Sequence, residues 1–296
     1  MLVVLGYFVV LAAVIGGFAL TGGELGAFFQ PSELLIIGGA GLGAFIVGNN
    51  AKALKATLKA LPLMFKGSQY NKSNYLDLLA LLFLLLGKSR QYGMMSLEAD
   101  IEDPHNSAIF MNYPRLLADV TIMNFVVDYL RLMVSGSMNA FEIEALIDEE
   151  IDTAEHEAEQ PAGSINSVGD ALPAFGIVAA VMGVVHALAS ADRPAAELGE
   201  LIAHAMVGTF LGILLAYGFI LPLASLLRQK SAEKTKVLLC IKAVLLAAIN
   251  GSAPQIAVEF GRKTLFSGVR PTFYELEEHV RQVKSAVQSP ASENGS

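Results

Sequence analysis

The sequence predicts an all-α integral membrane protein with four transmembrane helices and a large helical cytoplasmic domain. Its 296 residues have a mean hydropathy of +0.53, and only 16% of them are charged, compared with roughly 25% in an average soluble domain. The apolar residues also gather in separate stretches, several of which reach the length of about 20 residues that a helix needs to cross a bilayer. No β-strand pattern or internal repeat stands out.

Four apolar stretches define the predicted domain plan. The second is the shortest, with an apolar run from Leu34 to Gly48, and the third and fourth each contain one histidine, His186 and His204. A further run, Leu78–Leu86, is too short to cross a membrane and predicts a buried soluble helix. We expect transmembrane helices at residues 1–21, 33–50, 170–191 and 201–227, a cytoplasmic helical domain at 51–169, and cytoplasmic C-terminal helices with a disordered tail at 228–296.

Lysine and arginine residues near the helix ends predict the orientation, because they concentrate on the cytoplasmic side of a membrane. The connection at 21–32 has none, and the connection at 192–200 has only Arg193. Basic residues instead follow the second and the fourth helix: Lys52, Lys55, Lys59, Lys66 and Lys72, then Arg228, Lys230, Lys234 and Lys236. Both termini and the segment 51–169 are therefore predicted to be cytoplasmic.

The apolar stretches, with the second taken as Leu34–Gly48, contain no aspartate, glutamate, lysine or arginine. Proton and cation pathways in membranes usually depend on an ionisable group within the spanning helices. Either this chain transports nothing, or a partner subunit supplies the carboxylate. The net charge of −8 indicates no nucleic-acid surface, and the single cysteine, Cys240, is interpreted as structural, with no metal site.

Small residues recur at steps of three or four in the predicted spans and allow helix backbones to approach closely. Packing within one chain or contact with other subunits would each account for them. The stripes are Gly39 and Gly43 in the second helix, Gly176, Ala180, Gly183 and Ala187 in the third, and Gly208, Gly212 and Ala216 in the fourth.

Two prolines, Pro173 and Pro222, lie near the cytoplasmic ends of the third and fourth helices. Each removes a backbone hydrogen bond and favours a bend, so the pair would suit a conformational gate on the inner side. Pro173 could instead be a first-turn proline, which a helix tolerates. In the cytoplasmic part, the acid-rich segment 141–160 indicates either a solvated helix face or a charged docking surface.

Several segments resemble the MotA/TolQ/ExbB proton channel family and, within it, the flagellar stator proteins. The signature is the run AMVGTFLGIL at 205–214, followed after seven residues by Pro222. The other segments are MLVVLGY at 1–7, PSELLIIGGAGLGAFIVGNN at 31–50, DALPAFGIVAAVMGVVHALASADRPAAELG at 170–199 and EFGRKTL at 259–265. The resemblance covers essentially the whole chain apart from the C-terminal tail.

The resemblance implies a non-enzymatic subunit of an ion-driven motor in the bacterial inner membrane, without a cofactor. Five such subunits would surround a dimer of the partner MotB, whose single membrane helix carries the proton-binding aspartate. The complex would deliver torque to the rotor protein FliG. Each proton that crosses 100 mV releases about 2.3 kcal/mol, which is the energy available to the rotation.

The resemblance also assigns roles to single residues. It places the gate at Pro173 and Pro222 and a pore-lining threonine at Thr209. Ala180 occupies the position of a second threonine in sodium-driven relatives, and the loss of that hydroxyl favours protons. Tyr217, one of the few polar side chains in the spans, completes the predicted pore-facing set. The rotor-facing charges fall on Arg90, Glu98 and, more weakly, Glu150.

Two other classes of function are alternatives. An ExbB- or TolQ-like energiser of outer-membrane processes would have three spans and an external amino terminus, whereas this sequence predicts four spans with both ends inside. The other class is an inert membrane scaffold or a solute transporter. A transporter would show inverted repeats and broken helices around a midplane site, and this sequence shows neither. The pattern of spans favours the motor subunit.

Overall fold

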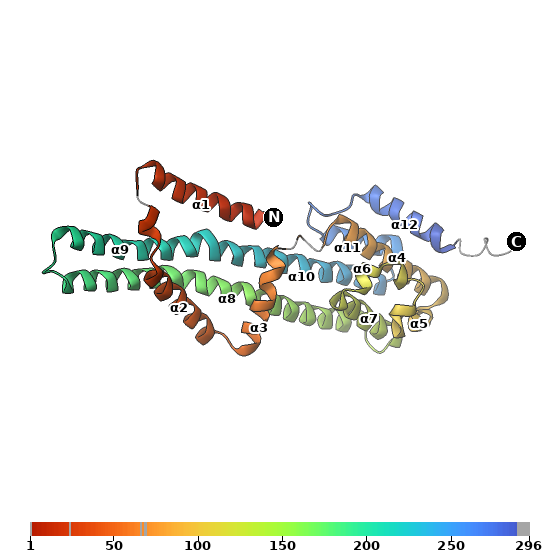
Figure 1. Cartoon of the computed structure of the whole chain (residues 1–296). Coiled ribbons are helices and arrows are strands. Elements are labelled where there is room, and N and C mark those ends of the chain that lie inside the picture. The colour runs from red at the N-terminus through yellow and green to blue at the C-terminus, as the bar shows by residue number, and fades with distance from the viewer. Residues whose placement is uncertain (1, 24, 66, 68–69, 289–296) are drawn as a thin grey trace. The chain divides into compact units, whose positions relative to one another are not determined.

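Figure 1 shows a computed structural model of the chain, which describes residues 2–23, 25–65, 67 and 70–288. Helices joined by short connections make up these ranges, and none of the described residues forms a strand. The all-α fold class is therefore confirmed. Most of the predicted tail, residues 289–296, lies outside the described residues, directly after α12 (Phe273–Gln288).

The chain divides into two compact units, each considered by itself. Unit 1 consists of Met1–Gly67 and His156–Ser231, and unit 2 of Ser68–Glu155 and Ala232–Ser296. The helices α8 (Ala140–Ala189) and α10 (Leu221–Ile249) each contribute a part to both units. The border predicted between residues 169 and 170 therefore falls inside α8, where the helix does not break.

Unit 1 contains the apolar helices. Among the described residues, three helical stretches are long and apolar enough to cross a membrane: Leu2–Leu20, Ala140–Ala189 and the continuous stretch Ala195–Ile249. The helix Pro31–Val47 is apolar but shorter. The elements of unit 1 are α1 (Leu2–Leu20), η1 (Leu25–Phe28), α2 (Pro31–Gly48), α3 (Ala51–Ala60), η2 (Leu61–Phe65), the later part of α8, α9 (Ala195–Ile213), the π-helical segment η6 (Leu214–Ile220) and the start of α10.

Asparagine and proline side chains define the ends of α2. Pro31 occupies its first turn, where the missing N–H costs no helical hydrogen bond. At the other end the Asn49 amide donates to the Phe45 carbonyl at 2.8 Å, and the Asn50 side chain accepts from the backbone N–H of Ala53 at 2.8 Å to begin α3. The helix therefore begins before the predicted residue 33 and ends before the predicted residue 50.

Helices α8 and α9 run side by side from the turn that joins them (Figure 1). A Cβ atom built on Gly176 of α8 would lie 2.8 Å from the carbonyl oxygen of Gly208, and one on Gly212 would lie 2.7 Å from that of Leu172. These glycines therefore serve close packing within the chain. By contrast, a Cβ on Gly39 of α2 would meet no described atom within 4 Å, so that stripe faces away from the chain.

Helix α1 packs on the π-helical segment η6. The Tyr7 hydroxyl donates to the carbonyl of Phe219 at 3.0 Å, and the two rings lie 4.8 Å apart between centroids. A π-helical segment displaces carbonyls from the regular ladder, and a side-chain donor can satisfy one of them. None of the described residues of α1 is buried, so most of its apolar surface remains available to lipid or to other chains.

Unit 2 has a core built around α4 (Lys72–Tyr92). The predicted buried run Leu78–Leu86 lies in that core, and only Leu84 within it is half-buried. Cys240 of α10 is buried in the same core, and burial raises the pKa of its thiol to about 12, which agrees with a structural role. The remaining elements are η3 (Met94–Leu97), α5 (Glu98–Glu102), η4 (Pro104–Asn106), η5 (Phe110–Asn112), α6 (Pro114–Leu117), α7 (Val120–Ser135), the start of α8, the later part of α10, α11 (Pro254–Thr264) and α12.

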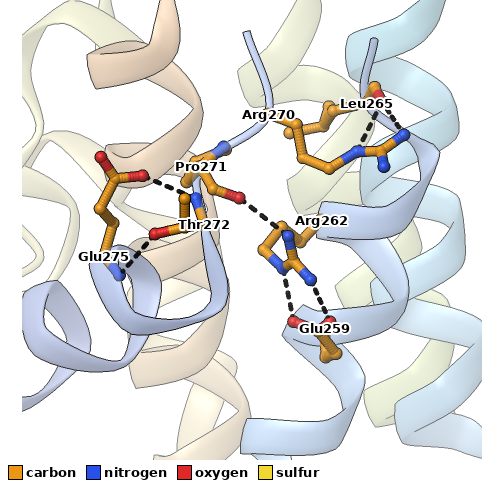
Figure 2. A network of polar contacts seen from close by, with 7 residues as sticks. All are labelled: Glu259, Arg262, Leu265, Arg270, Pro271, Thr272 and Glu275. Atoms are coloured by element: carbon orange, nitrogen blue, oxygen red, sulfur yellow. Dashed lines mark hydrogen bonds and ion pairs between the residues drawn. The ribbon is translucent and has the colours of Figure 1, made fainter. Parts of the chain in front are cut away.

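The segment EFGRKTL at 259–265 ties α11 to the start of α12 (Figure 2). Arg262 is buried; its Nε donates to Glu259 at 2.6 Å, and its Nη1 donates to the carbonyl of Pro271 at 2.8 Å. A buried guanidinium needs such partners to offset its desolvation. The same loop is held by Arg270, which donates to the Leu265 carbonyl, and by reciprocal capping between Thr272 and Glu275.

Candidate functional site

Thr209 and Ala180 lie close together where α9 contacts α8. A Cβ built on Gly176 would lie 3.4 Å from the Cα of Thr209, and one on Gly208 would lie 3.2 Å from the backbone nitrogen of Ala180. Both residues are half-buried. Tyr217 lies in η6 and is 65% exposed, so it is on the surface of the chain rather than in this contact. That the three residues face a pore remains a prediction.

Pro173 lies in the interior of α8, so the alternative of a first-turn proline is wrong. Because proline has no N–H, the carbonyl of Gly169, four residues earlier, loses its helical donor. A Cβ on Gly169 would lie 2.6 Å from the Cδ2 atom of Leu221, the residue before Pro222. The turn that Pro173 weakens therefore packs against the neighbour of Pro222, and the fold brings the surroundings of the two prolines together.

Pro222 is the second residue of α10, and only Leu221 separates it from the π-helical segment η6, which the sequence analysis did not predict. In a regular α-helix its ring would clash with the carbonyl four residues earlier, Gly218. The wider π turn relieves this clash, and π turns inside α-helices occur frequently at functional sites. In the sequence the only signal for it is the proline itself, within an otherwise apolar helix.

Glu33 is a functional candidate that the sequence analysis missed. Because α2 begins at Pro31, Glu33 lies in its first turn, and the expectation of apolar helices without an acid is wrong for α2. The residue is only 7% exposed, and its Oε2 has no hydrogen-bond partner among the described residues. A Cβ on Gly208 would lie 2.8 Å from that oxygen. The only signal in the sequence was a glutamate at the start of a helix. Such a glutamate usually stabilises the helix while exposed to water, so it did not indicate a buried acid.

The two strongest rotor-facing candidates are exposed at the ends of neighbouring helices. Arg90 lies in the last turn of α4, and Glu98 is the first residue of α5. Gly93, with φ of 85°, ends α4 between them, so the two side chains do not share one helix face. Neither forms an ion pair with any residue that the structure describes. Both charges are available to another protein.

An ion pair between half-buried Lys88 and buried Asp100 brackets the segment that holds Arg90 and Glu98. The Lys88 Nζ is 2.6 Å from Oδ2 of Asp100, and the Ser107 hydroxyl donates to Oδ1 of the same carboxylate at 2.6 Å. Asp100 is 6% exposed. Lys88 and Asp100 each stand two residues from one of the candidates, so the pair fixes how far apart Arg90 and Glu98 lie. The sequence showed these charges but not their partners.

Glu150, the weaker candidate, is engaged within the chain. Its Oε2 accepts a hydrogen bond from the Tyr129 hydroxyl at 2.6 Å. Burial of Tyr129 and this hydrogen bond raise the pKa of the tyrosine, so the hydroxyl remains a donor at neutral pH. Glu150 is exposed, yet part of its charge serves the packing of α7 against α8.

Comparison with known proteins decides the family. Residues 4–93 match the family model for the motility protein A N-terminal region, and residues 118–238 match that for the MotA/TolQ/ExbB proton channel family. The chain is 69% identical over 293 residues to Motility protein A of Salmonella typhimurium, covering 99% of each chain, and 68% identical with the same coverage to that of Escherichia coli. This chain belongs to the motility protein A family.

Solved structures agree with this fold. The chain matches a chain of Campylobacter jejuni MotAB with a TM-score of 0.73 at 22% identity, over 90% of this chain and 95% of that one. It matches a chain of the flagellar MotAB stator complex of Bacillus subtilis with a TM-score of 0.70 at 25% identity, over 86% and 92%. The motility protein A family comprises membrane stator subunits of proton-channel type, not enzymes, and the ExbB- or TolQ-like alternative is not favoured.

Proposed function

We propose that this stator subunit assembles with MotB in a bacterial inner membrane and converts a proton gradient into torque on the rotor protein FliG. The observation that carries the proposal is the identity of 69% with a motility protein A over 99% of both chains. The solved neighbours, which are MotAB complexes, support MotB as the partner. The four spans would be α1, α2, the later part of α8, and the continuous stretch of α9, η6 and the start of α10. Both termini would be cytoplasmic.

Five copies would surround a MotB dimer. Two features of unit 1 support contacts with other chains: α1 has no buried residue among those described, and the Gly39–Gly43 face of α2 is open. Small residues on an open helix face permit close approach of another helix in the membrane. The bilayer would cover the remaining apolar surface.

The transported ion in this proposal is the proton. An aspartate of MotB would lie against the contact between Thr209 and Ala180, and the exposed Tyr217 of η6 would complete the pore-facing set. The alanine offers no oxygen that could replace the hydration shell of a sodium ion, whereas a proton needs no such cage. Swimming should therefore be indifferent to replacement of external sodium by potassium, and sodium-dependent swimming would contradict the assignment.

Pro173 and Pro222 would form the gate that turns protonation of that aspartate into helix movement. The close packing of Gly169 on Leu221 supports this role, because a shift of the turn at Pro173 would press on the neighbour of Pro222. Arg90 and Glu98 would contact FliG, with Glu150 contributing less because Tyr129 already engages it.

Co-purification tests the assembly. An affinity-tagged form of this chain is expressed with MotB in a bacterium without stator genes, extracted in mild detergent, and weighed by native mass spectrometry. We expect a complex of five copies with two of MotB and restored swimming of the cells. Retention of no MotB, or a different ratio, would overturn the assembly proposed here.

A further inference from the structure

The carboxyl group of Glu33 occupies an unusual place in unit 1. It lies in the first turn of α2, is 7% exposed, and directs Oε2 at the bare backbone of Gly208 in α9. No described residue donates a hydrogen bond to this oxygen. A buried carboxyl oxygen that accepts no hydrogen bond is a site where a proton or a water molecule can bind. Stabilisation of the helix start alone would not require burial.

The surroundings of Glu33 connect it to the contact between Thr209 and Ala180. Gly208 precedes Thr209, and a Cβ built on it would lie 2.8 Å from Oε2 of Glu33 and 3.2 Å from the backbone nitrogen of Ala180. Glu33 therefore lies at the edge of the contact that we propose faces the partner's aspartate.

A second titratable group lies near Glu33 on α9. His204 is one turn before Gly208, close enough for its positive form to favour the ionised Glu33 carboxyl. One turn further out, Oε1 of Glu200 lies 3.9 Å from Nε2 of His204. Apart from Glu33, α2 carries no titratable side chain, and the segment of α8 from Pro173 to Val185 carries none. His186 follows this segment of α8 directly and is exposed, and Glu197 of α9 pairs with Arg193.

Exposure falls steadily along the three groups. The side chain of Glu200 is 70% exposed, that of His204 is 37% exposed, and Glu33 is 7% exposed. We propose that Glu200, His204 and Glu33 form a proton uptake path from the outer end of α9 to the contact between Thr209 and Ala180. The proposal rests on the orientation and the MotB partner given under the proposed function.

The proton transfer along this path needs no reactant other than water. A proton from external water is captured at His204, with Glu200 holding the charged imidazolium, and passes to the carboxylate of Glu33. The neutral carboxylic acid then gives a proton to water at Thr209, from which the aspartate of the partner receives it. Glu33 returns to the carboxylate, so one proton enters and one leaves in each cycle.

Rotation of motors containing the full chain and MotB, at low load and varied external pH, tests the path. The variants are Glu33→Gln, Glu33→Asp and His204→Gln, with Glu197→Gln as the control, an exposed acid of α9 that pairs with Arg193. We expect Glu33→Gln to slow rotation by roughly tenfold, less than the roughly 100-fold loss typical of an essential proton-transfer group, because water can bypass one member. Glu33→Asp should recover much of the speed.

Two further readouts separate proton transfer from a structural role. Co-purification with MotB should be unchanged in Glu33→Gln, and its speed should depend more steeply on external pH than that of the unmodified motor. Unchanged speed and pH dependence in Glu33→Gln overturn the path, as does failure of Glu33→Gln and Glu33→Asp alike to assemble. If the unmodified chain itself binds no MotB and drives no rotation, the proposed function fails instead.

Discussion

At the scale of single residues, the charges of unit 2 are of two kinds. Arg90 and Glu98 are exposed and have no ion-pair partner in the described part of the chain, whereas Lys88 and Asp100 are paired and largely shielded from water. Exposed pairs contribute only about 0–1 kcal/mol to stability, so Arg90 and Glu98 can be changed without unfolding the chain. A loss of function at these positions would therefore report on a contact with another protein.

We expect Arg90→Glu to impair swimming strongly while the membrane abundance of the protein stays normal, because the substitution turns attraction to the rotor into repulsion. A compensating charge reversal on FliG should restore part of the swimming speed. Swimming rate and immunoblots measure the two quantities, and Lys284→Glu, another exposed charge of unit 2, is the control. Normal motility of the double variant Arg90→Ala and Glu98→Ala would show the assignment to be wrong.

Asp100→Ala should loosen the segment that positions Arg90 and Glu98, the charges that we propose face the rotor. The substitution leaves Lys88 and Ser107 without their acceptor, and the loss of a largely buried charged partner costs about 2–3 kcal/mol. Hydrogen exchange of residues 93–107 should become faster, and swimming should slow. Glu102→Ala removes an exposed pair with Arg131 nearby and should cost less than about 1 kcal/mol. Equal rates of hydrogen exchange at residues 93–107 in the two variants would contradict the positioning role of Asp100.

At the scale of elements, the contact of α8 with α9 depends on the absence of side chains. Gly176→Ala would place a methyl group 2.8 Å from the carbonyl oxygen of Gly208, and backbone cannot move aside as a flexible side chain can. Such overpacking costs about 1–3 kcal/mol. We expect lower membrane abundance and a lower Tm in detergent. Gly39→Ala, where no described atom lies within 4 Å, should leave the folding of the chain unchanged.

Each of the two prolines removes a backbone donor from its helix and favours a local bend. Replacing each by alanine would restore that donor and so favour one state of the proposed gate. The double variant Pro173→Ala and Pro222→Ala should therefore assemble with MotB but rotate slowly or not at all. Rotation of tethered cells together with co-purification measures this. Full-speed rotation of the double variant would exclude the gate.

At the scale of the whole molecule, the proposed gate and the proposed rotor contacts lie in different units. Unit 1 holds the two prolines and Glu33, and unit 2 holds Arg90 and Glu98, the charges that we propose face the rotor. The buried acid Glu33 stands at one end of α2, and no described residue of the later part of α8 or of α9 places a carboxylate beside Thr209. Conduction through the whole path should therefore still require the acid of a partner.

Expressed without MotB in vesicles that carry a proton gradient, this chain should give no proton flux above background. Addition of MotB during expression should produce measurable flux, followed by a pH-sensitive dye inside the vesicles. Empty vesicles and vesicles with MotB alone are the controls. Robust flux from this chain by itself would show that it contains a complete relay.

Much of the architecture could be predicted from local patterns. The apolar stretches, the buried run Leu78–Leu86 and the cap of α4 by Asn71 all depend on residues close together in the chain, where hydropathy and side-chain hydrogen bonding act directly. The same holds for the break at Gly93, where a positive φ ends the helix. For these features the amino-acid sequence by itself was sufficient.

Other features required the tertiary structure. The continuity of α8 through Pro173, the burial of Glu33 against Gly208 and the pairing of Lys88 with Asp100 were not predicted. Each depends on which residues distant in the chain come into contact, or on packing that overrides a local preference, and periodicity carries no information about either. The sequence by itself determined that this is a helical protein with long apolar helices, whereas the rotor-facing role of Arg90 and Glu98 remains a prediction. Only the tertiary structure decided which glycines face each other and which carboxylate is buried between helices, because both follow from backbone contacts across the fold.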